Sequence, residues 1–310
     1  MSENPIISVV IPLYNKRASI GRTLESVRLQ TIEDIEILVV DDGSTDGSGE
    51  IVEAFPDPRI RYLQQPNTGP NQARNNAVKV ARSDLFAFID ADDEWKPTHL
   101  ENILEAEKRF PSFGLYATNF YWVMPDGTIK HPVFPGLVED HGFCQVNNYF
   151  AVSKKNQILT CSSVALNRQV LEQAGGFPAS EFVKQAQPLW VKLVLNHPIG
   201  FCLEPTLIYR LDAENRWDAH IRKIRSRLTD CDTVLLKNLD EALSKRHFRN
   251  TAVPIEDIRA YRRQVLFWRA SDLIRIGQLR KGRIAALKMF IFPEYYIRSI
   301  KLIIKSFIYR

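Results

Sequence analysis

The stretch Phe88-Ile89-Asp90-Ala91-Asp92-Asp93 decides the fold class of this chain. An apolar run that includes Leu85 and Phe86 precedes it and predicts a buried β-strand, and the acids begin where that run stops. Acids at the carboxyl end of a strand lie where open α/β sheets bind ligands. Strand alternation would point Asp90 and Asp92 to one face, where two carboxylates can hold a hard divalent cation. The alternative is a solvated acidic turn that closes the strand, so the surrounding sequence must decide.

The amino-terminal residues predict the first unit of the same sheet. Residues 6–11 form an apolar run typical of a buried strand, and the turn sequence Pro12-Leu13-Tyr14-Asn15 closes it. Ile20, Leu24 and Val27 then recur at helical spacing. A strand followed by an amphipathic helix is the repeating unit of an α/β fold.

The next two units repeat this order. A second strand is predicted over residues 35–40, and the acid-rich turn at residues 41–47 follows it directly. Residues 69–77 predict the start of another helix, which leads through Ala81 to the strand before Asp90. The predicted fold class is therefore α/β, with a Rossmann-like, mostly parallel sheet and helices on both faces.

A set of sequence elements, taken in order, resembles the family 2 glycosyltransferases of the GT-A fold, of the type that builds bacterial cell-surface polysaccharides. These elements are Pro12-Leu13-Tyr14-Asn15, Val40-Asp41-Asp42-Gly43-Ser44-Thr45-Asp46, Asn67-Thr68-Gly69 with Ala73-Arg74-Asn75, Phe88-Ile89-Asp90-Ala91-Asp92-Asp93-Glu94-Trp95, Gly175-Gly176-Phe177, Leu189-Trp190 and Tyr209-Arg210. They cover roughly residues 6 to 216. The resemblance implies inverting, hexosyl-type transfer from a nucleotide diphosphate sugar, with a UDP-sugar expected, to a hydroxyl of a glycan or lipid-linked acceptor.

The same resemblance implies a set of nucleotide-binding residues. These are Pro12, Tyr14, Asn15, Asp41, Arg74, Asp90 and Ala91. Asp41 would accept a hydrogen bond from the imide N–H of the base, and a helix N-cap is the alternative. Arg74 would contact the base or a phosphate, with a surface helix arginine as the alternative. Asp42 and Asp46 are expected to serve turn and cap geometry instead.

Metal binding is also implied by the resemblance. Asp90 would touch the sugar or a water on the metal, and Asp92 would ligate Mn²⁺ or Mg²⁺ across the two phosphates. Asp212 is a further candidate ligand, because many relatives carry a histidine two residues after the Tyr-Arg pair. A loop acid paired with Arg210 or Arg216 is the alternative for Asp212. Asp93 is expected to be an N-cap or a supporting group.

The catalytic base of the family is missing from this sequence. In the family an acidic pair precedes the Leu-Trp helix, and the second acid takes the proton of the acceptor hydroxyl. Counting back from Trp190 places this pair at Gln185 and Ala186, and the spacing from Phe177 agrees. Neither residue can accept a proton, since an amide has no useful basicity and alanine has no polar group.

Three explanations of the missing base stay open. The chain is a natural pseudoenzyme that keeps sugar-nucleotide binding, an engineered inactive form, or an enzyme in which another acid such as Glu181 or Asp212 serves. Losing a general base costs about two to four orders of magnitude in rate, while donor binding can survive. The alternative function is therefore a catalytically inactive sugar-nucleotide-binding scaffold in a membrane-associated glycan assembly complex.

Other classes of protein are disfavoured by motif and composition. The sequence contains neither a P-loop nor a dinucleotide fingerprint. With 310 residues and 45% hydrophobic content the chain can bury a large core. Its four cysteines and six histidines show no metal-ligand spacing, and we expect structural roles and free thiols. The first residues lack the pattern of a signal peptide, so a cytoplasmic location is expected.

Charge divides the chain near residue 215. From Arg216 onward there are 22 Lys/Arg and 9 Asp/Glu, a balance of +13, which leaves −8 for the rest of the +5 total. We therefore expect a nucleotide-sugar-binding domain over 1–215 and a basic helical region over 216–310. No nucleic-acid module accompanies this charge, so nucleic acid is not an expected partner.

The last segment predicts an amphipathic helix. Ile297, Ile300, Ile303, Ile304 and Phe307 share one face at helical spacing, while Arg298, Lys301 and Lys305 share another. The apolar run is too short and too charged to span a bilayer. We expect peripheral attachment to the inner face of the cell membrane. The alternative is packing on the catalytic domain with the basic face in water.

Overall fold

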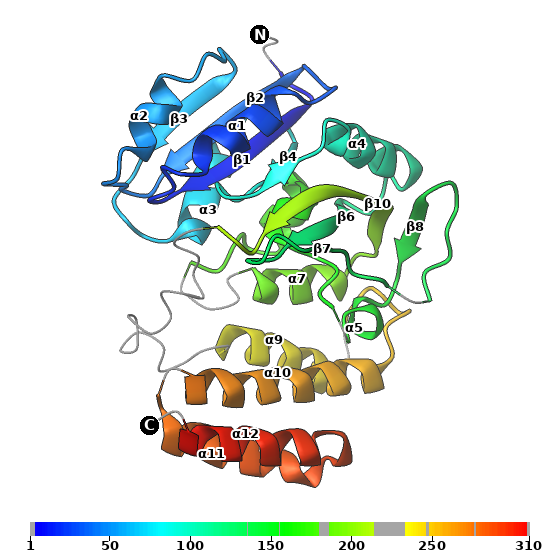
Figure 1. Cartoon of the computed structure of the whole chain (residues 1–310). Coiled ribbons are helices and arrows are strands. Elements are labelled where there is room, and N and C mark those ends of the chain that lie inside the picture. The colour runs from blue at the N-terminus through cyan, green and yellow to red at the C-terminus, as the bar shows by residue number, and fades with distance from the viewer. Residues whose placement is uncertain are drawn as a thin grey trace.

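The computed structural model describes residues 4–134, 136–154, 156–179, 186–213, 233–245, 248–275 and 277–308. Its centre is a 10-stranded sheet with the order β3-β2-β1-β4-β9-β6-β10-β5, to which β7 is added on β6 and β8 on β10 (Figure 1). The strands are β1 Ile7–Leu13, β2 Ile35–Asp41, β3 Ile60–Gln64, β4 Leu85–Phe88, β5 Glu94–Trp95, β6 Leu115–Val123, β7 Ile129–Lys130, β8 Phe143–Val146, β9 Val164–Asn167 and β10 Ile199–Arg210.

The strand directions confirm the predicted α/β class. Strand β1 pairs in parallel with β2 and β4, and β2 pairs in parallel with β3. Strand β9 runs antiparallel to both β4 and β6, and β10 is parallel to β6. Six of the 10 strands, namely β1, β2, β3, β4, β6 and β10, therefore share one direction.

Helices connect the strands of the first half of the sheet. The helices of the sheet region are α1 Ile20–Arg28, α2 Ser48–Glu53, α3 Pro70–Val80, α4 His99–Arg109, α5 Tyr149–Val152, α6 Arg168–Gln173 and α7 Gln187–Val194, with a 3₁₀ turn η1 at Cys161–Ser163. The chain moves outward from β1 to β3 and then returns to β4. Because such crossovers are right-handed, α1 and α2 cover one face and α3 covers the other.

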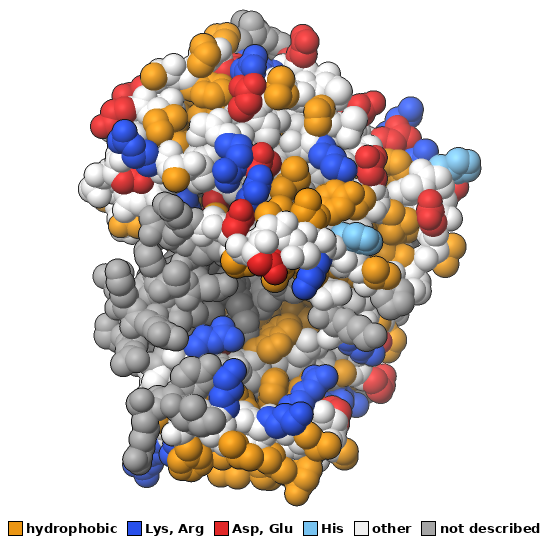
Figure 2. All heavy atoms as spheres, in the orientation of Figure 1, with side chains coloured by type: hydrophobic (Ala, Val, Ile, Leu, Met, Phe, Trp, Pro, Cys, Tyr) orange, Lys and Arg blue, Asp and Glu red, His pale blue; other side chains and the backbone are white. Residues whose placement is uncertain are grey.

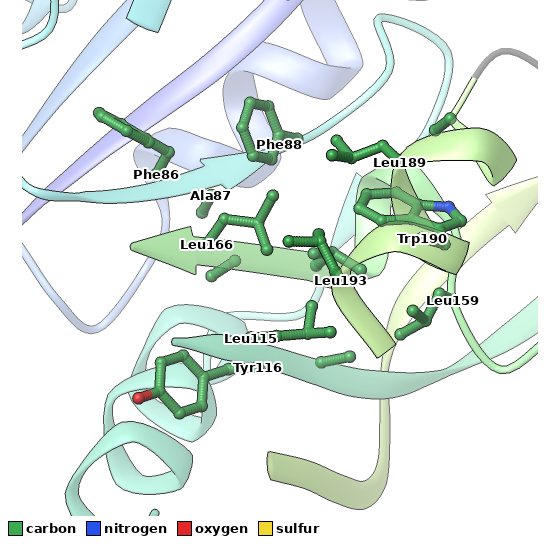
Figure 3. Close-up of a cluster of buried hydrophobic side chains, with 14 of the residues drawn as sticks. Phe86, Ala87, Phe88, Leu115, Tyr116, Leu159, Leu166, Leu189, Trp190 and Leu193 are labelled. Atoms are coloured by element: carbon green, nitrogen blue, oxygen red, sulfur yellow. The ribbon is translucent and has the colours of Figure 1, made fainter. Parts of the chain in front are cut away.

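Helix α7 packs against the middle of the sheet and completes the core there. Figure 3 shows Leu189, Trp190 and Leu193 of α7 facing Phe88 of β4 and Leu166 of β9. All five side chains are buried. The ring of Trp190 also lies 6.1 Å from that of Phe177, which in turn lies 5.0 Å from Phe88. The predicted glycine-pair and Leu-Trp elements are thus fixed to the carboxyl end of β4.

The basic region predicted at the carboxyl terminus is helical in its described residues. Its helices are α9 Thr233–Lys245, α10 Ile255–Arg275, α11 Leu279–Lys288 and α12 Tyr296–Ile308, with 3₁₀ turns η2 at Met289–Ile291 and η3 at Pro293–Tyr295. Figure 1 shows α9 and α10 as a layer beneath α7, with α11 and α12 as a further layer. Leu235, Leu239 and Tyr261 join the main hydrophobic core. The predicted boundary near residue 215 lies outside the described residues and stays a prediction.

Glycine permits the close contact between the two helical layers. A Cβ atom on Gly282 of α11 would lie 2.5 Å from Cγ1 of Ile274 and 3.1 Å from the carbonyl oxygen of Ala270, both on α10. Any larger residue would push the layers apart. Among the described helices, none combines the length and the apolar content needed to cross a bilayer.

Candidate nucleotide and metal site

The first candidate residue, Asp41, ends β2 at the carboxyl edge of the sheet. It is buried, and its neighbour in the register is Leu13 at the end of β1. Its carboxylate accepts a hydrogen bond from the backbone N–H of Ser44 at 2.8 Å and from the hydroxyl of Tyr62 at 2.6 Å. Burial and the hydrogen bond to Asp41 raise the pKa of Tyr62 to about 12. Asp41 is thus held in a fixed orientation by groups that donate hydrogen bonds.

The adjacent acid, Asp42, shapes the site. It is buried and accepts hydrogen bonds from the backbone N–H groups of Thr68 at 2.7 Å and Gly69 at 2.8 Å, and from the side-chain amide of Gln65 at 2.7 Å. These contacts fix the loop that leads into α3. Asp46 accepts from the backbone N–H groups of Ser48 and Arg17, each at 3.0 Å. Both acids have the turn-building contacts that the sequence predicts.

The loop after β1 docks on the loop after β2. Asn15 adopts a left-handed conformation with φ of 50°. Its backbone N–H donates to the Ser44 hydroxyl at 3.0 Å, and its side-chain oxygen accepts from the N–H of Thr45 at 2.8 Å. Pro12 is buried within β1, while Tyr14 is exposed. The structure therefore places Pro12, Tyr14, Asn15 and Asp41 together at the ends of β1 and β2.

Arg74 and Asp90 form an ion pair beside this edge. Arg74 lies on the buried face of α3, and its Nη2 lies 2.5 Å from Oδ1 of Asp90. The guanidinium also donates to Asn71 at 3.1 Å and lies 5.5 Å from the ring centroid of Phe177. Its Nε has no hydrogen-bond partner among the described residues, although it is buried. The carboxylate of Asp90 remains about one-third exposed, at 34%.

Asp90 and Asp92 lie in a turn after β4 and not in the strand itself. Strand β4 ends at Phe88, and residues 90–93 form a turn closed by the N–H of Asp93 and the carbonyl of Asp90 at 3.0 Å. Strand alternation therefore does not orient Asp90 and Asp92, because it applies only within the strand. Asp90 pairs with Arg74, whereas Asp92 pairs with Lys16, whose Nζ lies 2.6 Å from Oδ2 of Asp92.

The other two residues of this turn, Asp93 and Ala91, hold it in place. Asp93 is buried and accepts hydrogen bonds from the Ser162 hydroxyl at 2.6 Å and the backbone N–H of Arg210 at 2.9 Å. Burial, with Asp92 and Asp90 nearby, raises the pKa of Asp93 well above its usual value. Ala91 is buried, and its carbonyl accepts from the Ser19 hydroxyl at 2.8 Å. These contacts tie the turn to η1, β10 and the start of α1.

Asp212 lines a pocket together with Lys16, the partner of Asp92. The pocket has a volume of about 570 Å³ and is lined by Asn15, Lys16, Arg17, Ala18, Ser19, Arg22, Asp46, Ile51, Asp212 and Ala213. Lys16 therefore contacts Asp92 and shares this pocket with Asp212. Asp212 itself pairs with Arg210 at 3.4 Å, as the alternative prediction states. Within the described ranges no three metal-binding side chains come together.

The position at which the family base is expected lies at the amino end of α7. Ala186 is the N-cap residue of this helix, is 7% exposed and makes no side-chain cap bond. The chain that leads toward it is fixed to α3, since Asn75 donates to the carbonyl of Phe177 at 2.8 Å and accepts from its N–H at 2.9 Å. Gln185 and Glu181 lie outside the described residues, as does Arg216.

Three supporting residues were missed by the sequence analysis. Lys16 follows the Pro-Leu-Tyr-Asn element directly, so its position next to a known motif was a usable signal. Tyr62 lies on β3, and only the register of β3 with β2 brings it to Asp41. Ser162 donates to Asp93 from η1, 69 residues away in the sequence. Nothing local in the sequence identifies Tyr62 or Ser162 as part of the site.

Comparison with solved structures identifies the fold. The structure of Staphylococcus aureus TarS 1–349 in complex with UDP-GlcNAc has a TM-score of 0.56 at 18% identity, over 97% of this chain and 91% of TarS. The mannosyltransferase PcManGT from Pyrobaculum calidifontis, in complex with GDP-Man and Mn²⁺, has a TM-score of 0.58 at 17% identity, over 98% of this chain and 86% of that one. The fold is therefore the GT-A fold of these transferases.

Sequence comparison gives the family. Glycosyltransferase EpsH of Bacillus subtilis, a putative enzyme by its name, is 39% identical over 104 residues, which are 33% of this chain and 30% of EpsH. The chain thus matches about a third of the length of such relatives. The Escherichia coli β-1,3-glucosyltransferase WfaP, which is named for UDP-Glc and α-D-GlcNAc-diphosphoundecaprenol, is 32% identical over 193 residues, 61% of this chain and 70% of WfaP.

The family model agrees with these relatives and with the elements at the carboxyl edge of the sheet. The model described as glycosyl transferase family 2 matches residues 8–175. This range contains Asp41, Arg74, Asp90 and Asp92 and ends before position 186. The chain belongs to glycosyl transferase family 2.

Proposed function

We propose that this chain binds a nucleotide diphosphate sugar at the carboxyl edge of β1, β2 and β4, as a member of an inverting glycosyltransferase lineage. The observation that carries the proposal is the position of Asp41, the Arg74–Asp90 pair and the Asp92–Lys16 pair around these strand ends. The acceptor is a hydroxyl of a glycan or a lipid-linked glycan. WfaP supports this acceptor class, because its name specifies a diphosphoundecaprenol-linked sugar.

The base of the donor is proposed to be uracil. Asp41 has a carboxylate held by Ser44 and Tyr62, and a carboxylate suits the imide N–H of uracil. The UDP-GlcNAc complex of TarS and the UDP-Glc in the name of WfaP support this choice. The GDP-Man complex of PcManGT is the competing precedent for a purine base. The transferred sugar is a hexose in this proposal.

A divalent metal fits the donor set at Asp92. This carboxylate already has a cationic partner in Lys16 at 2.6 Å, so the position favours positive charge. Two carboxylates, Asp92 and Asp90, with diphosphate oxygens would make the oxygen-rich environment that Mn²⁺ or Mg²⁺ prefers. When bound, such a metal would neutralise charge on the leaving diphosphate. Asp212 is a further proposed ligand, because it shares the pocket with Lys16.

The protein residues supply positioning and charge. Arg74 is a buried cation that pairs with Asp90, so it holds this carboxylate in place and puts positive charge beside the strand ends. The rigid support from Asp42 and Asp93 keeps the loops in place without reorganisation. In this proposal Ala186 stands where the family base is expected, so we assign no base for the acceptor hydroxyl among the residues that the structure describes.

Alanine at the position of the expected base supports a second candidate function. In that reading the chain binds the sugar nucleotide and acts as a scaffold in a glycan assembly complex at the cytoplasmic side of the membrane. Ala186 at the N-cap of α7 is the observation that favours it. Turnover with a matched acceptor separates the two functions, because a scaffold binds the donor and transfers nothing.

Calorimetry with UDP tests the donor site. Binding is expected in the presence of Mn²⁺, and it should weaken strongly with a chelator or in Asp92→Ala. Asp126→Ala is the matched control, since Asp126 is an exposed carboxylate in the turn between β6 and β7. Equal UDP affinity with metal, with chelator and in Asp92→Ala would reject the proposed metal-dependent site.

A further inference from the structure

Helix α12 exposes three large apolar side chains to solvent, while Ile300 and Ile303 of the same face are half-buried. Ser299 and Ser306 are fully buried against the rest of the protein, and the Ser299 hydroxyl has no hydrogen-bond partner among the described residues. Ile297, Ile304 and Phe307 are exposed at 66%, 58% and 57%. A helix that packs to bury apolar surface would turn the other way, because burying an unpaired hydroxyl is unfavourable and burying isoleucine is favourable.

The neighbouring helix continues the same apolar surface. Half of the 14 large hydrophobic side chains that are exposed in the described structure lie between residues 284 and 307. We name the terminal apolar surface after six of them: Ile284, Leu287, Ile291, Ile297, Ile304 and Phe307. Figure 2 shows hydrophobic side chains in a row along the lower edge of the molecule, where Figure 1 places α11 and α12. A patch of this kind marks an interaction surface.

The orientation of α12 is fixed by specific contacts. Arg283 of α11 donates from Nε to the Ser306 hydroxyl at 2.8 Å and from Nη2 to the Ser306 carbonyl at 3.1 Å. The guanidinium of Arg283 also lies 3.8 Å from the ring centroid of Phe307. Arg263 of α10 also pairs with Glu294 of η3, just before α12, at 3.0 Å. These contacts hold the serine face inward and leave Ile297, Ile304 and Phe307 outward.

The positive charge around the terminal apolar surface indicates what kind of partner it binds. Residues 277–308 carry seven basic residues, Arg280, Lys281, Arg283, Lys288, Arg298, Lys301 and Lys305, and one acid, Glu294, which gives +6. Arg298, Lys301 and Lys305 are exposed beside the apolar face of α12. A second copy would bring the same positive charge to the contact, which opposes self-association. An anionic partner with an apolar interior matches both the charge and the exposed isoleucines.

We propose that the terminal apolar surface docks on an anionic lipid bilayer. The apolar side chains enter the boundary between headgroups and acyl chains, and Arg298, Lys301 and Lys305 contact the phosphates. Helices α11 and α12 lie in the plane of the interface and do not cross it. Docking on the bilayer does not depend on the donor site. Only its biological role, which is to bring the protein to a lipid-linked acceptor, rests on the proposed function.

Vesicle binding of the full chain without nucleotide tests this proposal. Vesicles of phosphatidylcholine with one-third phosphatidylglycerol should pull down the protein, and Ile297→Ser/Ile304→Ser/Phe307→Ser should abolish this. The matched control is Ile129→Ser/Val133→Ser/Val138→Ser, which changes three side chains exposed at 65%, 67% and 86% elsewhere, and it should bind normally. Arg298→Gln/Lys301→Gln/Lys305→Gln should weaken binding to anionic vesicles about a hundredfold and remove most of its salt dependence.

Two further measurements keep the outcomes distinct. Circular dichroism melting shows whether each variant is folded. UDP calorimetry shows whether its donor site still binds nucleotide, so loss of vesicle binding can be told apart from loss of donor binding. Unchanged vesicle binding by the folded apolar variant would overturn the proposal. A second result would also overturn it: the unmodified chain does not bind vesicles, and analytical ultracentrifugation shows a dimer that the apolar variant converts to a monomer.

Discussion

The ammonium nitrogen of Lys16 lies 2.6 Å from the carboxylate of Asp92, which joins the loop after β1 to the turn after β4. Both side chains are largely buried, at 16% and 13% exposed. The carboxylate proposed as the metal ligand thus has an internal cation as its partner. A metal that binds Asp92 must displace this ammonium or share the carboxylate with it.

Lys16→Met is therefore expected to tighten metal binding. Without nucleotide, Mn²⁺ affinity measured by electron paramagnetic resonance should increase several-fold, because binding no longer breaks an ion pair. Lys79→Met, which removes an exposed lysine from α3, is the matched control and should leave the affinity unchanged. Equal Mn²⁺ affinity in Lys16→Met and the unmodified chain would show that the two cations do not compete.

Asp41→Asn is expected to have two linked effects. UDP affinity should fall by about tenfold or more, because a charge-assisted hydrogen bond to the base is lost. The pKa of Tyr62, about 12 in the unmodified chain, should fall toward its ordinary value, because the hydrogen bond to the carboxylate that helps raise it is removed. Calorimetry and ¹³C resonance of Tyr62 measure the two effects.

Tyr62→Phe is the control for this experiment. It leaves the Asp41 carboxylate and its bond from Ser44 in place, so UDP affinity should stay within a few fold. If Asp41→Asn binds UDP as well as the unmodified chain does, Asp41 does not contact the base.

Gln185→Glu combined with Ala186→Asp is expected to restore a base. Transfer to a matched acceptor should increase at least about a hundredfold, the lower end for a positioned general base, with donor affinity within a few fold. Gln185→Glu with Ala186→Asn is the matched control, because asparagine can cap α7 equally well but has no basicity. Fast transfer by the unmodified chain that the restored pair does not improve would direct attention to Glu181 or Asp212.

His99 is expected to make the protein acid-sensitive. It is fully buried, stacks on Trp95 at 4.2 Å, and its pKa is lowered by burial to about 3. In the unfolded chain its pKa is near 6.5, so the unfolded state binds the proton first as pH falls. The contribution of His99 is complete above about pH 6.5, and about 2 kcal/mol is lost between pH 7 and pH 5.

Denaturant unfolding at several pH values measures this contribution. In His99→Phe the loss of stability between pH 7 and pH 5 should shrink by about 2 kcal/mol, whatever the absolute stability of the variant. His141→Gln is the matched control, because the side chain of His141 is 84% exposed. An identical pH dependence in His99→Phe and the unmodified chain would contradict the assignment.

The strand ends of the site could be predicted from the sequence because the signals are local. An apolar run followed by an acid gives both the strand and its carboxyl end, as at Asp41 and Asp90. The order of the strands then brings these ends together, because β1 lies between β2 and β4. Local patterns of this kind predict where a ligand binds before any contact is known.

The partners of these acids could not be predicted in the same way. Lys16 is 76 residues from Asp92, and Tyr62 reaches Asp41 only through the register of two strands. The turn after β4 was also mispredicted, since strand alternation was extended beyond the last residue of the strand. For α12 the helix itself was predicted, but only the packing of Ser299 and Ser306 shows which face is inward, and Ile300 and Ile303 of the predicted apolar face are half-buried.

Substitution of either Asp41 or Asp42, the neighbouring acids at the end of β2, is expected to lower ligand affinity. Replacing Asp42 would release the backbone of Thr68 and Gly69, and with it the entry to the helix that carries Arg74. Ligand affinity would drop although Asp42 is fully engaged with protein groups. An alanine scan that measures only ligand affinity would count both acids as ligand contacts. A thermal melting curve for each variant would show which acid stabilises the loop and which one contacts the ligand.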